Sequence, residues 1–207
     1  FVKEERELAL IKTIENLTLI VYVSNMNSSI NKMHWKLIND SFNDITTGPI
    51  KMTNTERLNA YVASLLVWNV KLHNLHWNVT GKLFKPLHEY TEALYDKAFE
   101  AYDEVAELLK MKGEMPHATL RGSVELSVVE EVAPRLFSSC EVVAEVEADM
   151  KKMAKLAREI RDAAAGEDDF QTQGLFEGYL AGYAKELWFL SAMRADARQE
   201  GCCPAKA

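Results

Sequence analysis

The stretch KLHNLHWNVTGKLFKPLHEY, residues 71–90, joins two segments of helical periodicity and holds three of the chain's five histidines. Gly81 is typical of a helix end, and Pro86 suits the first turn of the helix that follows. If the chain reverses direction beside Gly81, His76 and His88 lie opposite each other on the two helices. Two imidazoles at one end of a helical hairpin are half of a metal site.

Helical periodicity continues through most of the chain from Met52 onward, with almost no strand alternation. Four long helices are predicted, with a longer link between the second and the third, in which VELSVVEEVA (124–133) forms a short helix. This pattern predicts an all-α, ferritin-like four-helix bundle with one crossover. The predicted helices run from an N-cap at Thr53 or Asn54 to Gly81, from about Pro86 to Gly113 and Pro116, from about Pro134 to Ala165, and from near Asp168 onward.

A change in composition near residue 51 divides the chain. Residues 1–51 are rich in Asn, Ile, Lys and Ser, and the dipeptide Gly48-Pro49 at the change is a loop signal. We therefore interpret 1–51 as an appended segment: an extension, a fusion or an expression remnant. His34 in this segment is interpreted as structural. Residues 52–207 are predicted to form one domain with a short mobile C-terminal tail.

Composition narrows the class of function. A net charge of −7 argues against general attraction to nucleic acid or to an anionic membrane, and it suits a protein that handles cations. The apolar run LIVYV near the start is far too short to span a bilayer. Three cysteines, two of them adjacent, do not make a disulfide framework, which favours a reducing cytoplasm.

Carboxylates would have to complete the metal site, and Asp103 and Glu107 form an i,i+4 pair on one helix. A solvated acidic stripe is the alternative interpretation. Asp103 lies fifteen residues after His88, about 22 Å along a helix, so the two cannot share a metal within one chain. They can share one across a two-fold axis, in a dimer whose second helices pack antiparallel. Such nitrogen and oxygen donors suit iron or zinc.

Two further features bear on this site. His73 by itself fits a packed or capping residue better than a ligand. Ferritin-type di-iron bundles use Glu-x-x-His motifs inside the bundle, and the one match here is Glu114 to His117. Because Pro116 breaks a helix at that point, an intrachain di-iron centre is not expected.

The stretch HNLHWNVTGKLFKPLHEYTEALYDKAFEAYDEVAELL, residues 73–109, strongly resembles the Dps family, the DNA-binding proteins from starved cells or mini-ferritins. The shared pattern is His-Trp, then Gly and Phe, then Leu-His, then Asp-x-x-x-Glu. Residues 167–190 also resemble the family's last helix, and the resemblance covers Met52 to about Ala197. It implies a hollow shell of twelve identical subunits that oxidises Fe(II), preferably with hydrogen peroxide, and stores ferric mineral.

The resemblance also implies roles for single residues. His76 and His88 of one subunit would bind iron together with Asp103 and Glu107 of its two-fold partner. Trp77 would lie beside the iron and trap stray oxidising equivalents, with packing at the subunit interface as the alternative.

The acidic cluster between the third and fourth helices would line the three-fold pores that admit iron. The alternative is a set of negative charges that complement the start of a helix. The cluster consists of Glu167, Asp168 and Asp169.

Three departures from the family pattern qualify the resemblance. Leu108 stands where an arginine commonly follows the glutamate ligand, and Glu186 stands where a histidine is common before the last-helix tryptophan. The chain ends lack the lysine-rich tails of members that condense DNA, so DNA binding is predicted to be weak or absent. A DNA-compacting protein with a secondary metal site and a purely structural cage displaying 1–51 remain the alternatives.

Overall fold

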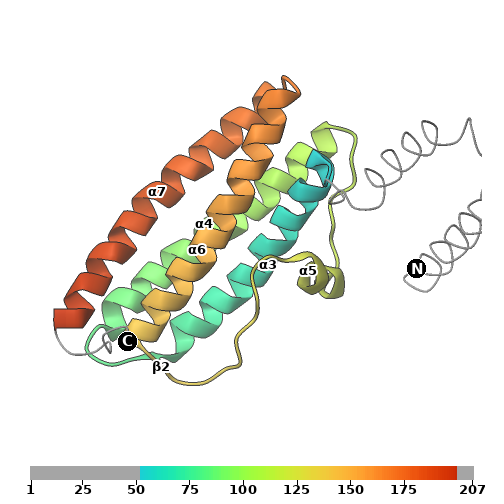
Figure 1. The fold of residues 1–207 in the computed structure, drawn as a ribbon. Helices are drawn as coiled ribbons and strands as arrows, with labels where there is room; N and C mark the ends of the chain where they lie inside the picture. Colours follow the sequence, from blue (N-terminus) through green and yellow to red (C-terminus); the bar gives the residue numbers. More distant parts are fainter. Residues whose placement is uncertain (1–51, 200–207) are drawn as a thin grey trace, which may run out of the picture. The chain divides into compact units, whose positions relative to one another are not determined.

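The protein is described by a computed structural model covering residues 52–199, and these residues fold into the predicted all-α bundle (Figure 1). Met52 begins the compact unit that contains them. The predicted appended segment 1–51 and the predicted tail 200–207 lie outside the described residues. The elements are α3 (Asn54–Asn78), β1 (Val79–Thr80), α4 (Phe84–Met111), α5 (Leu120–Leu126), β2 (Phe137–Ser138), α6 (Ser139–Gly166) and α7 (Phe170–Gln199).

Capping boxes define where α3 and α6 begin. The backbone N–H of Thr53 donates to Glu56 at 2.7 Å, and the backbone N–H of Glu56 donates back to the Thr53 hydroxyl at 3.2 Å. Ser138 and Glu141 repeat the arrangement at α6. Each box satisfies two backbone donors that a helix start otherwise leaves unpaired. The prediction that the third helix starts near Pro134 was therefore wrong, because the cap lies at Ser138.

The hairpin between α3 and α4 turns where the sequence predicted. Gly81 has a φ of +102°, a backbone conformation that favours glycine, and Pro86 lies in the first turn of α4. Beside this turn, β1 pairs in parallel with β2, with Val79 opposite Phe137. The sequence did not predict this pair, because two residues are too few to show alternation. The pair attaches the end of the crossover to the histidine-bearing end of the hairpin.

The short helix of the crossover lies earlier than predicted. It ends at Leu126, and the remainder of the predicted segment, 127–133, is not helical. Its backbone is bonded to side chains of α3 instead: the Val128 N–H donates to the Ser64 hydroxyl at 2.9 Å, and Asn74 Nδ2 donates to the Val132 carbonyl at 2.8 Å. Burial of Val129 against the core adds to this binding, so tertiary contacts override the local helical pattern.

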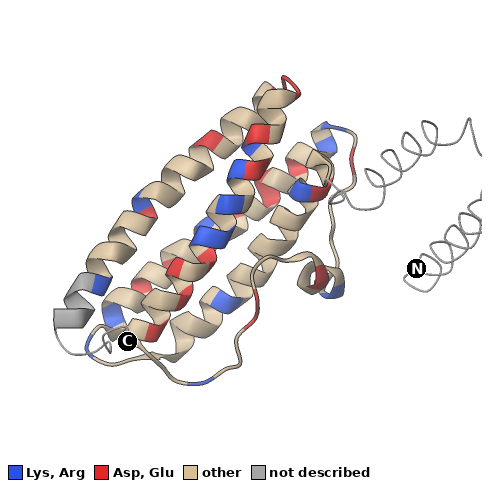
Figure 2. Ribbon diagram, in the orientation of Figure 1, with Lys and Arg blue, Asp and Glu red and all other residues tan. Residues whose placement is uncertain are grey.

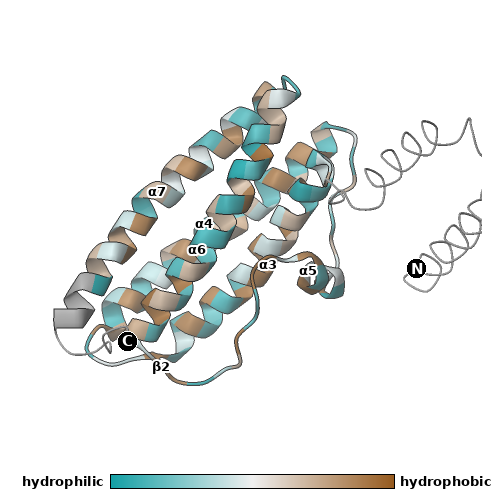
Figure 3. Ribbon diagram, viewed as in Figure 1, coloured by the Kyte–Doolittle hydropathy of each residue, from teal (hydrophilic) through white to brown (hydrophobic). Residues whose placement is uncertain are grey.

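The core lies between the four long helices, each of which alternates apolar and polar faces (Figure 3). The predicted stripe of the third helix is confirmed, since all six of its residues are buried: Val142, Val146, Met150, Met153, Leu156 and Ile160. Positive and negative side chains are interspersed along α6 (Figure 2). No helix of the described part is long and apolar enough to cross a membrane. Cys140, in the first turn of α6, is buried.

One ion pair is enclosed in this core. Lys71 Nζ of α3 lies 2.7 Å from an Asp149 oxygen and 2.9 Å from a Glu145 oxygen, both on α6. The Lys71 and Asp149 side chains are 4% and 2% exposed, respectively. Burial raises the pKa of Asp149, while the ammonium of Lys71 acts in the opposite direction. The pair therefore joins α3 to α6, and removal of either charge would leave the other buried without a counter-charge.

Candidate metal centre

The last turn of α3 and the second turn of α4 bring His76 and His88 together. Their ring centroids lie 3.6 Å apart and the ring planes are inclined by 22°, so the imidazoles stack. His76 is 6% exposed, and His88 is half-buried. The two rings therefore meet at the end of the hairpin, as its geometry predicted. Their role as metal ligands remains a prediction.

Reciprocal hydrogen bonds across the hairpin determine the chemical state of both rings. His76 Nδ1 donates to the His88 backbone carbonyl at 2.8 Å, and His88 Nδ1 donates to the His76 carbonyl at 3.0 Å. Because a carbonyl can only accept, each neutral ring carries its proton on Nδ1 and a lone pair on Nε2. Metal-binding histidines are commonly oriented by such a bond from the second nitrogen. The arrangement thus prepares two nitrogen donors.

Neighbouring side chains that sequence reasoning missed complete the packing around these rings. Thr91 is fully buried, and its hydroxyl lies 3.4 Å from His76 Nδ1 while donating to the Leu87 carbonyl at 2.8 Å. The Tyr95 ring meets His76 edge-on at 5.3 Å, and Phe84 lies 5.2 Å from His88. The signal available for Thr91 and Tyr95 was their position one and two helical turns after His88.

His73 has a different environment from the other two histidines. Its Nδ1 donates to the Asn69 carbonyl of its own helix at 2.8 Å, and its ring stacks on Tyr95 at 3.8 Å. Asn69 Nδ2 in turn donates to the Tyr95 carbonyl at 2.7 Å. His73 is thus a packing residue that ties α3 to α4, in agreement with its structural interpretation.

The predicted carboxylates, Asp103 and Glu107, are exposed on α4, and Val105 between them is buried. They do not approach the histidines of their own chain, from which Asp103 is about 22 Å away along the helix. Among the side chains that the structure describes, those of residues 52–194, no group of three or more from His, Cys, Asp and Glu could hold a metal ion. A site combining these carboxylates with the histidines therefore requires a second subunit, which remains a prediction.

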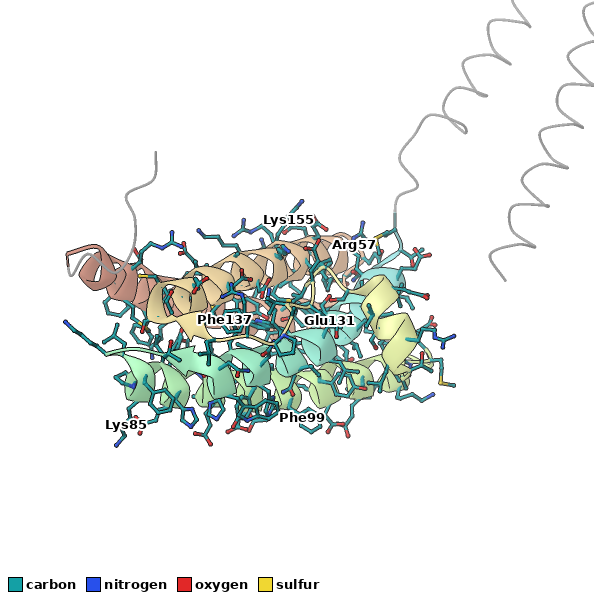
Figure 4. The ribbon with its side chains drawn as sticks, turned by 90° about the horizontal axis from the view of Figure 1, so that it is seen from below. Arg57, Lys85, Phe99, Glu131, Phe137 and Lys155 are labelled. Atoms are coloured by element: carbon teal, nitrogen blue, oxygen red, sulfur yellow. The ribbon has the colours of Figure 1, made fainter. Side chains whose placement is uncertain are left out.

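Large apolar side chains are exposed on the two helices of the hairpin. Trp77 is 68% exposed and lies 5.4 Å from the His73 ring, and Phe84 is also exposed. Phe99 projects from the outer edge of α4, as does Lys85 (Figure 4). Exposed large apolar residues occur at interfaces with other proteins. These side chains therefore suit the subunit contact that the candidate site needs.

The acidic cluster lies at the connection between α6 and α7. Glu167 and Asp168 are exposed, and Asp168 has a φ of 56°. Asp169 forms an ion pair with Lys112 and accepts a hydrogen bond from the Thr172 backbone at 3.3 Å. Partial burial opposes ionisation of Asp169, but the bonds from Lys112 and Thr172 outweigh it and lower its pKa. Asp169 thus caps α7, as the alternative interpretation held, and the pore role remains a prediction.

Two of the three departures from the family pattern have a structural counterpart, because the third concerns the chain ends. Leu108 is 3% exposed and belongs to the core, so it offers no ionic support to Glu107. Glu186 accepts a hydrogen bond from the Tyr90 hydroxyl at 2.9 Å and pairs with Lys97 at 2.8 Å. Burial and the Glu186 carboxylate raise the pKa of Tyr90 well above its ordinary range, so this phenol remains a donor.

Comparisons with known proteins agree with the fold and with the hairpin. The Ferritin family, a ferritin-like domain, matches residues 55–199. A DNA protection during starvation protein of Brevibacillus brevis is 38% identical over 135 residues, which are 65% of this chain and 90% of that protein. The Helicobacter pylori protein of the same description is 32% identical over 141 residues, 68% of this chain and 98% of that one. The crystal structure of Dps from Staphylococcus aureus, 31% identical, superposes with a TM-score of 0.66, covering 68% of this chain and 94% of that one. The chain therefore belongs to the Dps group of the ferritin-like family.

Proposed function

We propose that the protein is an iron-oxidising and iron-storing mini-ferritin that protects against peroxide in the cytoplasm. The observation that carries this proposal is the pair of cross-hairpin bonds that leaves Nε2 of His76 and of His88 as donors at one end of the hairpin. Asp103 and Glu107 of a two-fold partner supply the oxygen ligands. Twelve subunits, built from such dimers, enclose the cavity in which ferric mineral is stored.

The proposed reaction couples two ferrous ions to one peroxide. Each Fe(II) loses one electron, and the peroxide takes up both electrons and two protons to leave as two molecules of water. This route avoids the one-electron step that releases hydroxyl radical. Carboxylate oxygens favour the harder Fe(III) product, while the small number of ligands leaves it able to move into the mineral.

Trp77, beside the site, would intercept oxidising equivalents that escape. Glu167, Asp168 and Asp169 would attract Fe(II) at the pores.

A double variant tests the proposed site directly. His76→Ala combined with Asp103→Ala should abolish fast peroxide-dependent oxidation of Fe(II) while leaving the assembly intact, because it removes one nitrogen and one oxygen ligand from every site. Stopped-flow absorbance follows the oxidation, and sedimentation velocity follows the assembly. A matched control, His117→Ala with Glu177→Ala, removes the same two kinds of group outside the site and should keep the wild-type rate. Undiminished oxidation in the first variant would refute the proposal.

DNA protection, named for the relatives, is the second candidate function. The net charge of −7 argues against direct DNA binding. Protection would then come from removal of Fe(II) and peroxide rather than from coating. A gel-shift titration across salt concentrations should show no retarded DNA at physiological salt; retardation there would overturn this assignment.

A further inference from the structure

A cleft of about 250 Å³ opens between α4 and α7, away from the histidine pair. Its floor consists of apolar side chains from all four long helices, among them Leu65, Leu94, Ala98 and Met150. The rings of Trp68, Tyr179 and Tyr183 also line it. The cleft is large enough for a small organic molecule with one or two rings, and its walls are mainly apolar, as ligand pockets usually are.

Glycines on α7 leave this space open. Gly178 and Gly182 line the cleft, and a Cβ built on either residue meets nothing within 4 Å. Glycine in the middle of a helix lowers stability relative to alanine. Neither position requires glycine for its backbone conformation or for packing within the described residues, because both are helical and open. The helix thus carries a destabilising residue where a side chain would only fill the cleft.

The ring of Trp68 forms part of the wall. Trp68 is 3% exposed, and its indole Nε1 is enclosed by protein atoms. An occupant of the open cleft therefore meets the apolar surface of this ring and not its N–H group.

The rim is acidic. Glu186 is neutralised by Lys97 at 2.8 Å, whereas Glu100 has no ion-pair partner among the described residues. Glu104, one turn after Glu100 on α4, accepts only the neutral Tyr179 hydroxyl, at 2.6 Å. Two uncompensated carboxylates therefore face an aromatic, apolar cleft. The complementary charge on an occupant is positive.

We infer that this cleft binds an arylalkyl amine: a flat apolar ring system that rests on the aromatic walls and carries one protonated amino group, on an alkyl carbon, toward Glu100 and Glu104. The ring fills the space beside Gly178 and packs against the Trp68 ring, and the ammonium pairs with the carboxylates. This binding is independent of iron oxidation and uses none of the residues of the metal centre.

Naphthylmethylamine and naphthylacetate provide a matched pair of probes, since they share a ring and carry opposite charges. Isothermal titration calorimetry on the metal-free, full-length protein should detect binding of the amine and about tenfold weaker or no binding of the acetate. Equal binding of both probes, or no binding of the amine, overturns the inference.

Two variants locate the site. Gly178→Leu fills the cleft and should abolish binding of the amine, while Glu100→Gln, an exposed change that does not disturb the fold, should weaken it about tenfold. Glu177→Gln on the outer surface of α7 is the control and should bind like the wild type. Unchanged affinity in Glu100→Gln would contradict the inference even if Gly178→Leu failed to fold. Loss of assembly in a folded Gly178→Leu protein, with no binding of the amine to wild type, would assign the cleft to a subunit contact instead.

Discussion

At the scale of single residues, three histidines of one hairpin use the same nitrogen in different ways. His73 donates Nδ1 to a carbonyl of its own helix and stacks on a tyrosine. His76 and His88 donate Nδ1 across the hairpin to each other's backbone. Their rings are therefore oriented by the meeting of two helices, so the donor pair exists only when the hairpin is closed. The orientation of the His73 ring depends instead on a bond within its own helix and on packing against Tyr95.

This difference predicts different responses to substitution. His88→Ala should weaken binding of Zn²⁺, used as a redox-silent probe, by about tenfold or more, because it removes one nitrogen donor and the ring on which the His76 ring stacks. His73→Ala should leave Zn²⁺ affinity within about twofold of the wild type, since it removes only packing. Calorimetric titration of the assembled protein measures both. Equal losses in the two variants would contradict the assignment of His73 as structural.

Residue spacing predicted the approach of His76 to His88 because it depends only on two helices and a turn. The tautomers and the roles of Thr91 and Tyr95 could not be predicted in that way. They depend on which backbone carbonyl faces which ring, and on angstrom-scale packing that residue type and periodicity do not encode. The carboxylate pair was found by its i,i+4 spacing, but that spacing also fits a solvated stripe.

At the scale of the elements, the capping box of α6 determines where the crossover ends. Hydrogen bonds from the Ser138 backbone and hydroxyl and from Arg135 lower the pKa of Glu141 from 4.5 to about 2. Ser138→Ala should reduce the free energy of unfolding by about 1 kcal/mol near neutral pH. A group whose pKa is lowered by folding stabilises the folded state at pH values above its unfolded-state pKa. This contribution is lost as the pH falls toward the folded-state pKa. The deficit of Ser138→Ala should therefore shrink between about pH 5 and pH 2, as measured by urea unfolding. Thr53→Ala, which removes the cap of α3, provides the comparison.

The enclosed ion pair predicts a pH dependence for the contact between α3 and α6. Lys71→Ala should lower the free energy of unfolding by about 3–5 kcal/mol near neutral pH, because it leaves the buried Asp149 carboxylate without a counter-charge. Burial already raises the pKa of Asp149, and loss of Lys71 raises it further. A raised folded-state pKa favours folding at lower pH, so the deficit should shrink as pH falls through the mildly acidic range.

Urea unfolding of Lys71→Ala near neutral pH and at about pH 5 tests this sign. The double variant Lys71→Met with Asp149→Leu is the control, because it replaces the charges with apolar groups of similar size and should lose much less stability. A deficit in Lys71→Ala that stayed constant with pH would assign the loss to a cavity rather than to the uncompensated charge.

At the scale of the whole molecule, the bundle was predictable because four long apolar stripes, two loop signals and one long link leave few alternatives. Errors arose in the crossover. There, α5 ends at Leu126, and hydrogen bonds to side chains of α3 hold residues 127–133 in a non-helical conformation. The strands β1 and β2 are too short to show an alternation of apolar and polar residues. Contacts between segments distant in the sequence control these features, and local periodicity does not report them.

Assembly should be a condition for oxidation. Phe99 is 58% exposed on α4. In the predicted antiparallel contact His88 faces Asp103 of the partner, so the contact is centred midway between these positions, within about one helical turn of Phe99. Phe99→Lys should dissociate the two-fold dimer, because it places a charge in each half of a self-complementary interface. Sedimentation velocity should then show smaller species, and rapid Fe(II) oxidation should be lost together with the assembly. Glu177→Lys introduces a lysine at an exposed position on α7 and should preserve both. Rapid oxidation by dissociated Phe99→Lys subunits would contradict a site shared between chains.

The appended segment 1–51 should be dispensable for both properties. The domain starts at its own capping box, in which Thr53 and Glu56 satisfy the first donors of α3 without any residue before Met52. Deletion of 1–51 should therefore leave the sedimentation coefficient consistent with the same number of subunits and leave the rate of Fe(II) oxidation per subunit unchanged. A deletion variant that assembled but oxidised Fe(II) more slowly would assign the segment a part in iron entry or oxidation. One that failed to assemble would make the segment part of the shell, and the boundary near residue 51 would then mark a change in composition rather than the edge of a folding unit.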